Sequence, residues 1–424
     1  MPGRKPTTAT LVCYQVGFGD CFLLSFHYPK DDRHVLIDFG STGLPPDASP
    51  DHLKRIAADI RTRTGGKLTA VVESHRHADH ISGYATSAGG KGPGDVIASL
   101  KPDLVIQPWT EDPRAKVNAT TASADPGKAF VASLGEMHAL AASVAPELRR
   151  LGPSLAPALN EQLGFLGTKN IANASAVNNL MRMGKKHAYV SYGSRSGLDA
   201  LLPNVKVHVL GPPTLKQSSA IAKQRSRDAA EFWQLHATTT RMYNTDRRSP
   251  LPGAATQTPG NSPAYTRWIR RNVQNIRGAT LLEIVRSLDK QMNNTSVILL
   301  FEVGRKALLF PGDAQIENWQ FALAKPETKA LLRGVSLYKV GHHASLNASP
   351  KTMWGMLANR SATASPMRLR TVVSTMAGKF GSPTSGTEVP RAKLLAELKK
   401  NSDFFSTHEL RGGVLNRVFE IALR

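Results

Sequence analysis

The stretch Glu73-Ser74-His75-Arg76-His77-Ala78-Asp79-His80 places three histidines and an aspartate within six residues. An apolar run at residues 68–73 precedes it and predicts a buried strand that ends near Ser74. Where a chain leaves a strand, H-x-H-x-D-H spacing lets side chains converge on one point. Imidazole nitrogens and carboxylate oxygens are ligands that suit Zn²⁺, Mn²⁺ or Fe²⁺. The stretch therefore predicts a metal site at the end of a strand.

Further strands and helices are predicted on both sides of this loop. Apolar runs separated by turn-forming residues indicate strands at 11–16, 21–26, 35–39 and 103–107, with a polar helix at 52–63. The pattern resumes with strands at 205–209, 296–301, 306–310, 337–340, 371–374 and 414–423, and a helix at 392–400. Strands that alternate with helices are typical of an α/β layer fold.

Two long segments interrupt this alternation. Residues 111–203 predict a helical insertion, because apolar residues between 134 and 151 recur at helical spacing. Residues 214–290 predict a second insertion, with four prolines and two glycines at 249–263. We therefore divide the chain into a first half (1–110), a helical insertion (111–203), a core strand (204–213), a basic insertion (214–290) and a second half (291–424).

The overall composition excludes two classes of protein. Of the 424 residues 41% are hydrophobic, and no apolar run reaches the length of about 18 residues that a spanning helix needs. This excludes an integral membrane protein and a fully disordered chain. Two cysteines, Cys13 and Cys21, cannot build a disulfide framework or a four-thiolate zinc site. The basic N-terminus lacks the apolar region of a secretory signal, so we expect a cytoplasmic protein.

The charge balance is strongly basic. There are 54 lysines and arginines against 32 acidic residues, which gives a net charge of +22. Such a balance favours a polyanionic partner, namely a nucleic acid, an anionic membrane surface or a phosphorylated substrate. A solvated basic surface without a partner remains an alternative, because charge does not choose among these.

The motifs together resemble a known superfamily. His75-x-His77-x-Asp79-His80 after a Val-Val strand resembles the signature of the metallo-β-lactamase superfamily, and residues 16–21 and 36–40 resemble its opening hairpins. Residues 293–297, 309–313 and 339–345 are similar to motifs of the ComEC-type competence nuclease domain and its soluble relatives. The resemblance covers roughly residues 11–110, 204–213 and 293–423. It implies an α/β fold, the metallo-β-lactamase αββα sandwich, here with two helical insertions.

The resemblance also implies a dinuclear metal site that holds two divalent transition-metal ions, Zn²⁺ or Mn²⁺. His75 and His77 would bind the first ion, and Asp79 and His80 the second. Asp313 would bridge the two ions with its two oxygens.

The last ligand would come from the pair His342-His343. His343 is expected to bind metal, and His342 is expected either to be that ligand itself or to face the substrate. With two metals that activate water, we expect Asp79, Asp313 and His342 to take part in catalysis.

The chain departs from the superfamily pattern at one ligand. The usual middle histidine is absent, and Asn293 and Asn294 stand at its place, as they do in the ComEC-like branch. The first metal is therefore expected to be held less tightly. His208 is a conceivable substitute, although its alternation with Val207 and Val209 favours a histidine on the polar face of a strand.

Substrate contacts are expected at two places. Asn293, Asn294 and Ser345 lie in motifs beside the predicted ligands. Residues 214–278 hold eleven basic residues against three acids, with four tryptophans and tyrosines among them. This insertion could follow a phosphate backbone through Arg267, Arg270 and Arg271, or it could be a solvated helical face.

The predicted function is metal-dependent cleavage of phosphodiester bonds, with DNA as the substrate and partner. Because this scaffold hosts several hydrolytic reactions, two alternatives stay open. One is a phosphodiesterase or esterase for small or lipid-linked substrates. The other is a non-catalytic nucleic-acid-binding module on the same scaffold.

Overall fold

The structure is a computed structural model and describes residues 5–112, 173–214, 216–222, 292–347, 349–384, 387–411 and 413–423. The predicted helical run at 134–151, the proline-rich loop at 249–263 and the three arginines Arg267, Arg270 and Arg271 lie outside these residues.

The first sheet has seven strands in the order β13-β1-β2-β3-β4-β5-β6. Neighbours from β13 to β3 run antiparallel, and those from β3 to β6 run parallel. The bounds are β1 (Thr8–Tyr14), β2 (Cys21–His27), β3 (Asp32–Phe39), β4 (Ala70–Val72), β5 (Leu104–Pro108), β6 (Lys186–Val190) and β13 (Asn416–Ala422).

The second sheet has six strands in the order β12-β11-β10-β9-β8-β7. The strands β12, β11, β10 and β9 are parallel, whereas β8 is antiparallel to both β9 and β7. The bounds are β7 (Lys206–Gly211), β8 (Ile298–Val303), β9 (Lys306–Phe310), β10 (Val335–Lys339), β11 (Arg370–Val373) and β12 (Asp403–Ser406).

The two sheets pack face to face around a shared apolar core. Side chains alternate between the faces of a strand, and on β2 Phe22 and Phe26 point to this core. Their rings lie 6.3 Å from Phe310 and 6.1 Å from Phe301 of the second sheet, respectively. On the other face of β2, Leu23 packs in a second cluster with helix residues.

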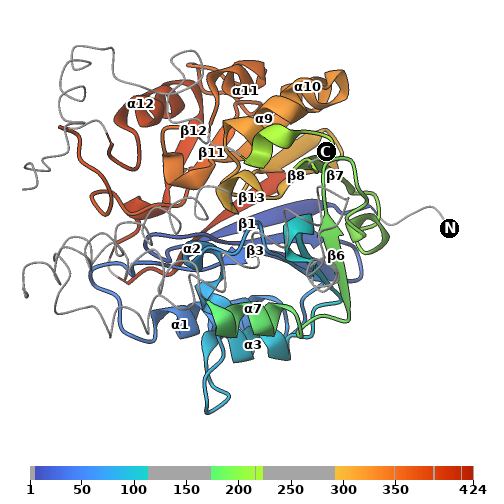
Figure 1. Ribbon diagram of the computed structural model, residues 1–424, viewed down its shortest axis with the longest axis vertical. Coiled ribbons are helices and arrows are strands. Elements are labelled where there is room, and N and C mark those ends of the chain that lie inside the picture. The colour runs from blue at the N-terminus through green and yellow to red at the C-terminus, as the bar shows by residue number, and fades with distance from the viewer. Residues whose placement is uncertain are drawn as a thin grey trace, which may run out of the picture.

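Helices cover the outer face of each sheet, so that the molecule has helix, sheet, sheet and helix layers (Figure 1). The first sheet is covered by α1 (His52–Arg63), α3 (Pro93–Ser99) and α7 (Ala174–Leu180). The second sheet is covered by α9 (Ile316–Leu323), α10 (Pro326–Arg333), α11 (Lys351–Met356) and α12 (Ala392–Asn401). The predicted α/β class is confirmed. None of the described helices is both long and apolar enough to cross a membrane.

Two strands were not predicted from the sequence. Residues 186–190 lie in the predicted helical insertion, yet they form β6 and pair in parallel with β5 at the edge of the first sheet. Residues 403–406 form β12 at the edge of the second sheet. Both strands are short and only partly buried, so their sequences carry little apolar pattern. Pairing with a neighbouring strand decides their conformation.

Candidate metal centre

The histidine-rich loop begins where β4 ends, at Val72, and runs into the short helix α2 (Ala78–Ile81). This helix lies against the end of β3. A Cβ atom on Gly40 would be 2.4 Å from the carbonyl oxygen of Ala78, so only glycine allows the two backbones to approach this closely. The close approach of α2 to β3 places Asp79 and His80 at the edge of the first sheet.

The second half contributes its candidate ligands, Asp313 and His343, from the ends of β9 and β10. Gly312, at φ 56°, follows β9, and a Cβ atom there would be 2.6 Å from Cβ of Ser74. The glycine therefore brings Asp313 close to the histidine-rich loop. After β10, residues 342–344 all have positive φ, between 42° and 63°. Left-handed backbone at non-glycine residues costs energy and is characteristic of functional sites.

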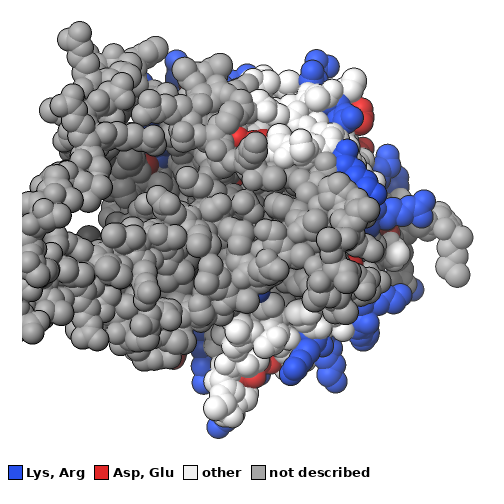
Figure 2. All heavy atoms as spheres, in the orientation of Figure 1, with Lys and Arg blue, Asp and Glu red and all other residues white. Residues whose placement is uncertain are grey.

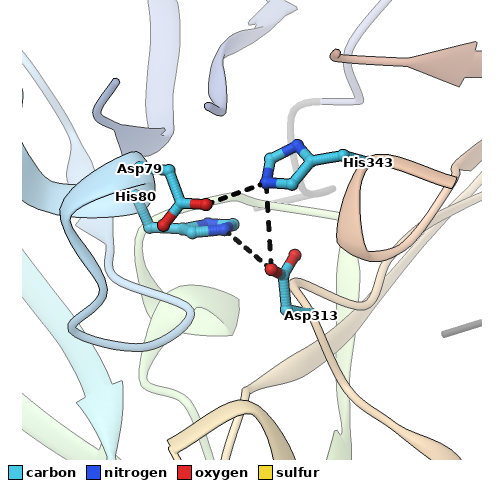
Figure 3. Close-up of side chains that lie close together, drawn as sticks. All are labelled: Asp79, His80, Asp313 and His343. Atoms are coloured by element: carbon cyan, nitrogen blue, oxygen red, sulfur yellow. Dashed lines mark hydrogen bonds and ion pairs between the residues drawn. The ribbon is translucent and has the colours of Figure 1, made fainter. Parts of the chain in front are cut away.

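Four side chains from these segments meet at the seam between the two halves (Figure 3). The distance from His80 Nε2 to Asp313 Oδ2 is 3.2 Å, and from His343 Nε2 to Asp79 Oδ2 it is 3.1 Å. His343 Nε2 lies 3.9 Å from Asp313 Oδ2. One atom from each of the four residues lies within 4.8 Å of the others, and all four are buried. We call Asp79, His80, Asp313 and His343 the four-residue group.

His75 and His77 form a separate pair beside this group. The distance from His75 Nε2 to His77 Nδ1 is 2.9 Å, and from His75 Nε2 to Asp313 Oδ2 it is 4.0 Å. Within the described part of the chain, no set of three or more metal-binding side chains inside 4.8 Å includes either histidine. We call His75 and His77 the two-histidine pair.

The carboxylate of Asp313 is oriented differently from the sequence-based expectation. Its Oδ2 atom is the oxygen that lies nearest to His75, His80, His342 and His343. Its Oδ1 atom accepts a hydrogen bond from the backbone N–H of His342 at 3.1 Å. In this arrangement one oxygen of Asp313 faces the histidines and the other faces the backbone of His342, and the role of Asp313 as a bridge between two metal ions stays a prediction.

Two outer contacts orient the histidines of the four-residue group. His80 Nδ1 lies 2.8 Å from Asp38 Oδ2, and Asp38 accepts two hydrogen bonds of 2.7 Å from the backbone and hydroxyl of Ser74. His343 Nδ1 lies 2.9 Å from the carbonyl oxygen of Ser374. Such contacts fix the ring and leave Nε2 directed at a metal position. Sequence reasoning missed Asp38, although an acid at the end of the buried strand β3 was a usable signal.

The charges of the site depend on one another. Burial opposes the charged form of His80, but the carboxylates of Asp313, Asp38 and Asp20 outweigh burial and raise its pKa well above the usual range. Burial likewise opposes the ionised form of Asp313, but the neighbouring histidines hold its pKa well below the usual range. The pKa of His75 is lowered, most strongly by burial and next by electrostatic repulsion from His80 and His77.

These features fit a bound divalent cation. Buried carboxylates need positive charge close by, and a bound metal ion would supply it. The Oδ1 atom of Asp79 is buried and makes no hydrogen bond to any described residue. Nitrogen and oxygen donors suit a transition metal. The four-residue group could therefore hold a metal ion.

The remaining predicted site residues differ in their exposure to solvent. The His342 side chain is 27% exposed, with Nε2 3.7 Å from Asp313 Oδ2, and its Nδ1 is 2.8 Å from the hydroxyl of Ser345. Asn293 and Asn294 are buried, and the backbone N–H of nearby Val297 donates to Ser74 at 2.9 Å.

His208 takes no part in the site. It lies on the edge strand β7, and its Nε2 is 3.0 Å from Glu302 Oε2 on the neighbouring β8. This matches the interpretation of His208 as a strand histidine.

Comparison with known proteins adds no family: the chain matches no protein-family model and no curated protein.

Proposed function

We propose that this protein is a metal-dependent hydrolase of the metallo-β-lactamase sandwich type that cleaves phosphodiester bonds, with DNA as its substrate. The observation that carries the proposal is the four-residue group, in which Asp79 and His80 from the first half meet Asp313 and His343 from the second. The layers of helix, sheet, sheet and helix, with the group at the seam between the halves, support the fold assignment.

Two divalent ions, Zn²⁺ or Mn²⁺, would be held by adjoining sets of residues. The four-residue group would hold one ion. His75 and His77 would hold the other, together with Asp313, whose Oδ2 is 4.0 Å from His75 Nε2. When bound, such ions activate water and stabilise negative charge on the reacting phosphoryl or carbonyl group.

The chain's own residues would position the reactants. Asp79 Oδ1, which has no hydrogen-bond partner among the described residues, could accept a hydrogen bond from the attacking water. His342 is more exposed than the other histidines of the site, and Ser345 holds its Nδ1. His342 is therefore the residue that we assign to contact with the substrate and to proton transfer to the leaving oxygen.

The choice of a nucleic acid as substrate rests on charge. The net charge of +22 favours binding of a polyanion, because each phosphate that is neutralised releases counterions. On the described part of the face seen in Figure 2, Lys and Arg side chains gather along the right-hand edge of the view, with some acidic side chains among them. The basic insertion adds Arg267, Arg270 and Arg271.

A parallel digestion assay tests the proposed function. Metal-loaded protein is incubated with plasmid, single-stranded DNA, RNA and bis-p-nitrophenyl phosphate, with and without a chelator. We expect chelator-sensitive cleavage of DNA and of the small diester. Cleavage of the small diester alone would favour the phosphodiesterase alternative, and DNA binding without any cleavage would favour the non-catalytic module.

Charge reversal in the basic insertion tests the substrate class. Arg267→Glu, Arg270→Glu and Arg271→Glu together should raise the DNA concentration needed for cleavage and reduce the slope of log affinity against log salt by about one unit per lost phosphate contact. Hydrolysis of bis-p-nitrophenyl phosphate should stay unchanged. The matched control reverses Lys393, Lys399 and Lys400 on α12, which changes the net charge equally. Equal effects in both variants would show a general charge effect rather than a DNA-binding insertion.

A further inference from the structure

Lys339 is a buried lysine behind the four-residue group. It is the last residue of β10, and only 2% of its surface is exposed. Its ammonium contacts Asp20 Oδ2, donates a hydrogen bond of 3.3 Å to the carbonyl oxygen of Gly312 and lies 3.9 Å from Asp313 Oδ1. A fully buried ammonium is costly without compensation, so this position requires an explanation.

Asp20, its partner, is fully buried in the turn before β2. Its backbone N–H donates to the carbonyl oxygen of Asp79 at 2.8 Å, which joins this turn to the helix of the first-half ligands. Its carboxylate lies 3.6 Å from His343 Nδ1 and 3.7 Å from His80 Nδ1. Both nitrogens have closer acceptors, the carbonyl oxygen of Ser374 and the carboxylate of Asp38. Asp20 is therefore placed to hold Lys339 rather than to orient either ring.

The ion pair joins the two halves of the molecule at the same seam as the ligands. Asp20 belongs to the first half and is tied to Asp79, whereas Lys339 belongs to the second half and contacts the Gly312–Asp313 turn. Buried ion pairs add little net stability compared with apolar residues, because desolvation offsets their attraction. A gain in stability is thus a weak reason for burying this ion pair here. Precise placement of the metal-binding side chains of the two halves is a stronger reason.

Asp20, Asp38 and His80 also lie close enough together to resemble a second cation site. Several of their atoms are already engaged: Lys339 contacts Asp20 Oδ2, and Asp38 binds Ser74 and His80 Nδ1. The ammonium of Lys339 therefore supplies the positive charge beside these carboxylates.

We propose that Lys339 and Asp20 are a positioning pair that assembles the metal centre before metal binds. This rests on the metal centre of the proposed function. The pair holds the two ligand-bearing segments at a set separation. The ammonium beside Oδ1 of Asp313, together with the backbone N–H of His342, keeps Oδ2 directed at the histidines.

Metal affinity, measured by competition with a chromogenic chelator, tests the proposal independently of activity. The double variant Asp20→Asn/Lys339→Met removes both charges, so the net charge of the site is unchanged, while the ion pair and the contacts of Lys339 with Gly312 and Asp313 are lost. We expect it to bind Zn²⁺ and Mn²⁺ about 10- to 100-fold more weakly, the usual effect of removing outer contacts. Asp20→Asn alone should bind more weakly still, because the unneutralised ammonium repels the cation and competes for Asp313.

The matched control is the ion pair Arg370–Asp403, which joins β11 and β12 with a distance of 2.8 Å from Nε to Oδ2. Arg370→Met/Asp403→Asn should bind metal like the wild type. Unfolding temperatures in excess chelator separate an effect on folding from an effect on metal binding.

Each outcome has a distinct meaning. Wild-type affinity in a folded double variant would overturn the positioning role and leave the proposed function intact. Absence of metal binding in the wild type would instead overturn the metal centre itself. If the double variant does not fold, Asp20→Glu keeps the charge but displaces the carboxylate. Weaker metal binding by Asp20→Glu supports the proposal, and unchanged binding overturns it.

Discussion

The four-residue group and the two-histidine pair lie side by side, but they are built differently. The four-residue group takes two ligands from each half of the molecule, and its closest nitrogen–oxygen contacts are 3.1 and 3.2 Å. The two-histidine pair comes from one loop, and its contact with Asp313 is 4.0 Å. Side chains that come from both halves are oriented by the whole fold, whereas the described residues give the two-histidine pair no third close metal-binding side chain. We therefore expect the four-residue group to bind metal more tightly.

The largest expected effect comes from Asp313→Ala. This variant should weaken metal binding both at the four-residue group and at the two-histidine pair, and so remove the difference in affinity between them. Oδ2 of Asp313 is the atom that both sets of residues share. Loss of metal stabilisation worth several kcal/mol would lower the rate on bis-p-nitrophenyl phosphate by about a thousandfold or more. The circular-dichroism spectrum should stay near that of the wild type. Substantial turnover in a metal-loaded Asp313→Ala protein would contradict the assignment of the shared ligand.

A smaller and selective effect should distinguish the two positions. His343→Ala should weaken binding of the tighter ion, whereas His77→Ala should weaken binding of only the second ion, each by about 100-fold or more, since direct ligands matter at least as much as outer contacts. Metal content after gel filtration and chelator competition measure both. His208→Ala is the control histidine, because its partner is Glu302 and not a site residue. Equal losses from His343→Ala and His77→Ala would show that the two ions bind as one cooperative unit.

The smallest effect is expected in the unmodified protein. Stepwise addition of a chelator to the metal-loaded wild type should release metal in two phases, because ions held by different ligand sets differ in affinity. The second ion should leave first, with an apparent affinity about tenfold weaker or more. Elemental analysis after each step measures the release. Release of two ions in a single phase would contradict the expected difference in affinity between the two sites. Release of only one ion in total would restrict metal binding to the four-residue group.

Much of the fold could be predicted from local patterns. The strands β2, β3 and β9 and the helices α1 and α12 lie within a few residues of the predicted bounds, because each carries an apolar or amphipathic pattern of its own. β6 and β12 were missed for the opposite reason: they are short edge strands, and pairing with β5 and β11 determines them. The α/β class followed from the alternation, whereas the assignment of strands to two separate sheets did not.

The site residues likewise divide into those that have a signal in the sequence and those that depend on the tertiary structure. The H-x-H-x-D-H loop was found because ligand-type side chains follow an apolar strand, whereas the Gly312-Asp313 turn after β9 was found through its resemblance to a motif of the ComEC-type nuclease domain. Asp20 and Lys339 were not predicted as site residues, because an isolated acid or lysine beside an apolar run has no local signature of its role, and Asp38 was missed although it stands at the end of a buried strand. Their importance depends on neighbours such as Ser74, His80 and Asp313, which lie elsewhere in the chain.

The sequence by itself determined most of the segments that become strands and helices, β6 and β12 excepted, and it determined that ligand-type side chains follow the strand ends, since these properties depend on residues a few positions apart. Only the tertiary structure decided that Asp79 and His343 meet, because they are 264 positions apart in the chain. It also decided that His343 rather than His342 enters the four-residue group and that one oxygen of Asp313 faces the histidines. Those results depend on how two sheets pack and on the left-handed turn after β10, and no local pattern of residues encodes the distance between two strand ends.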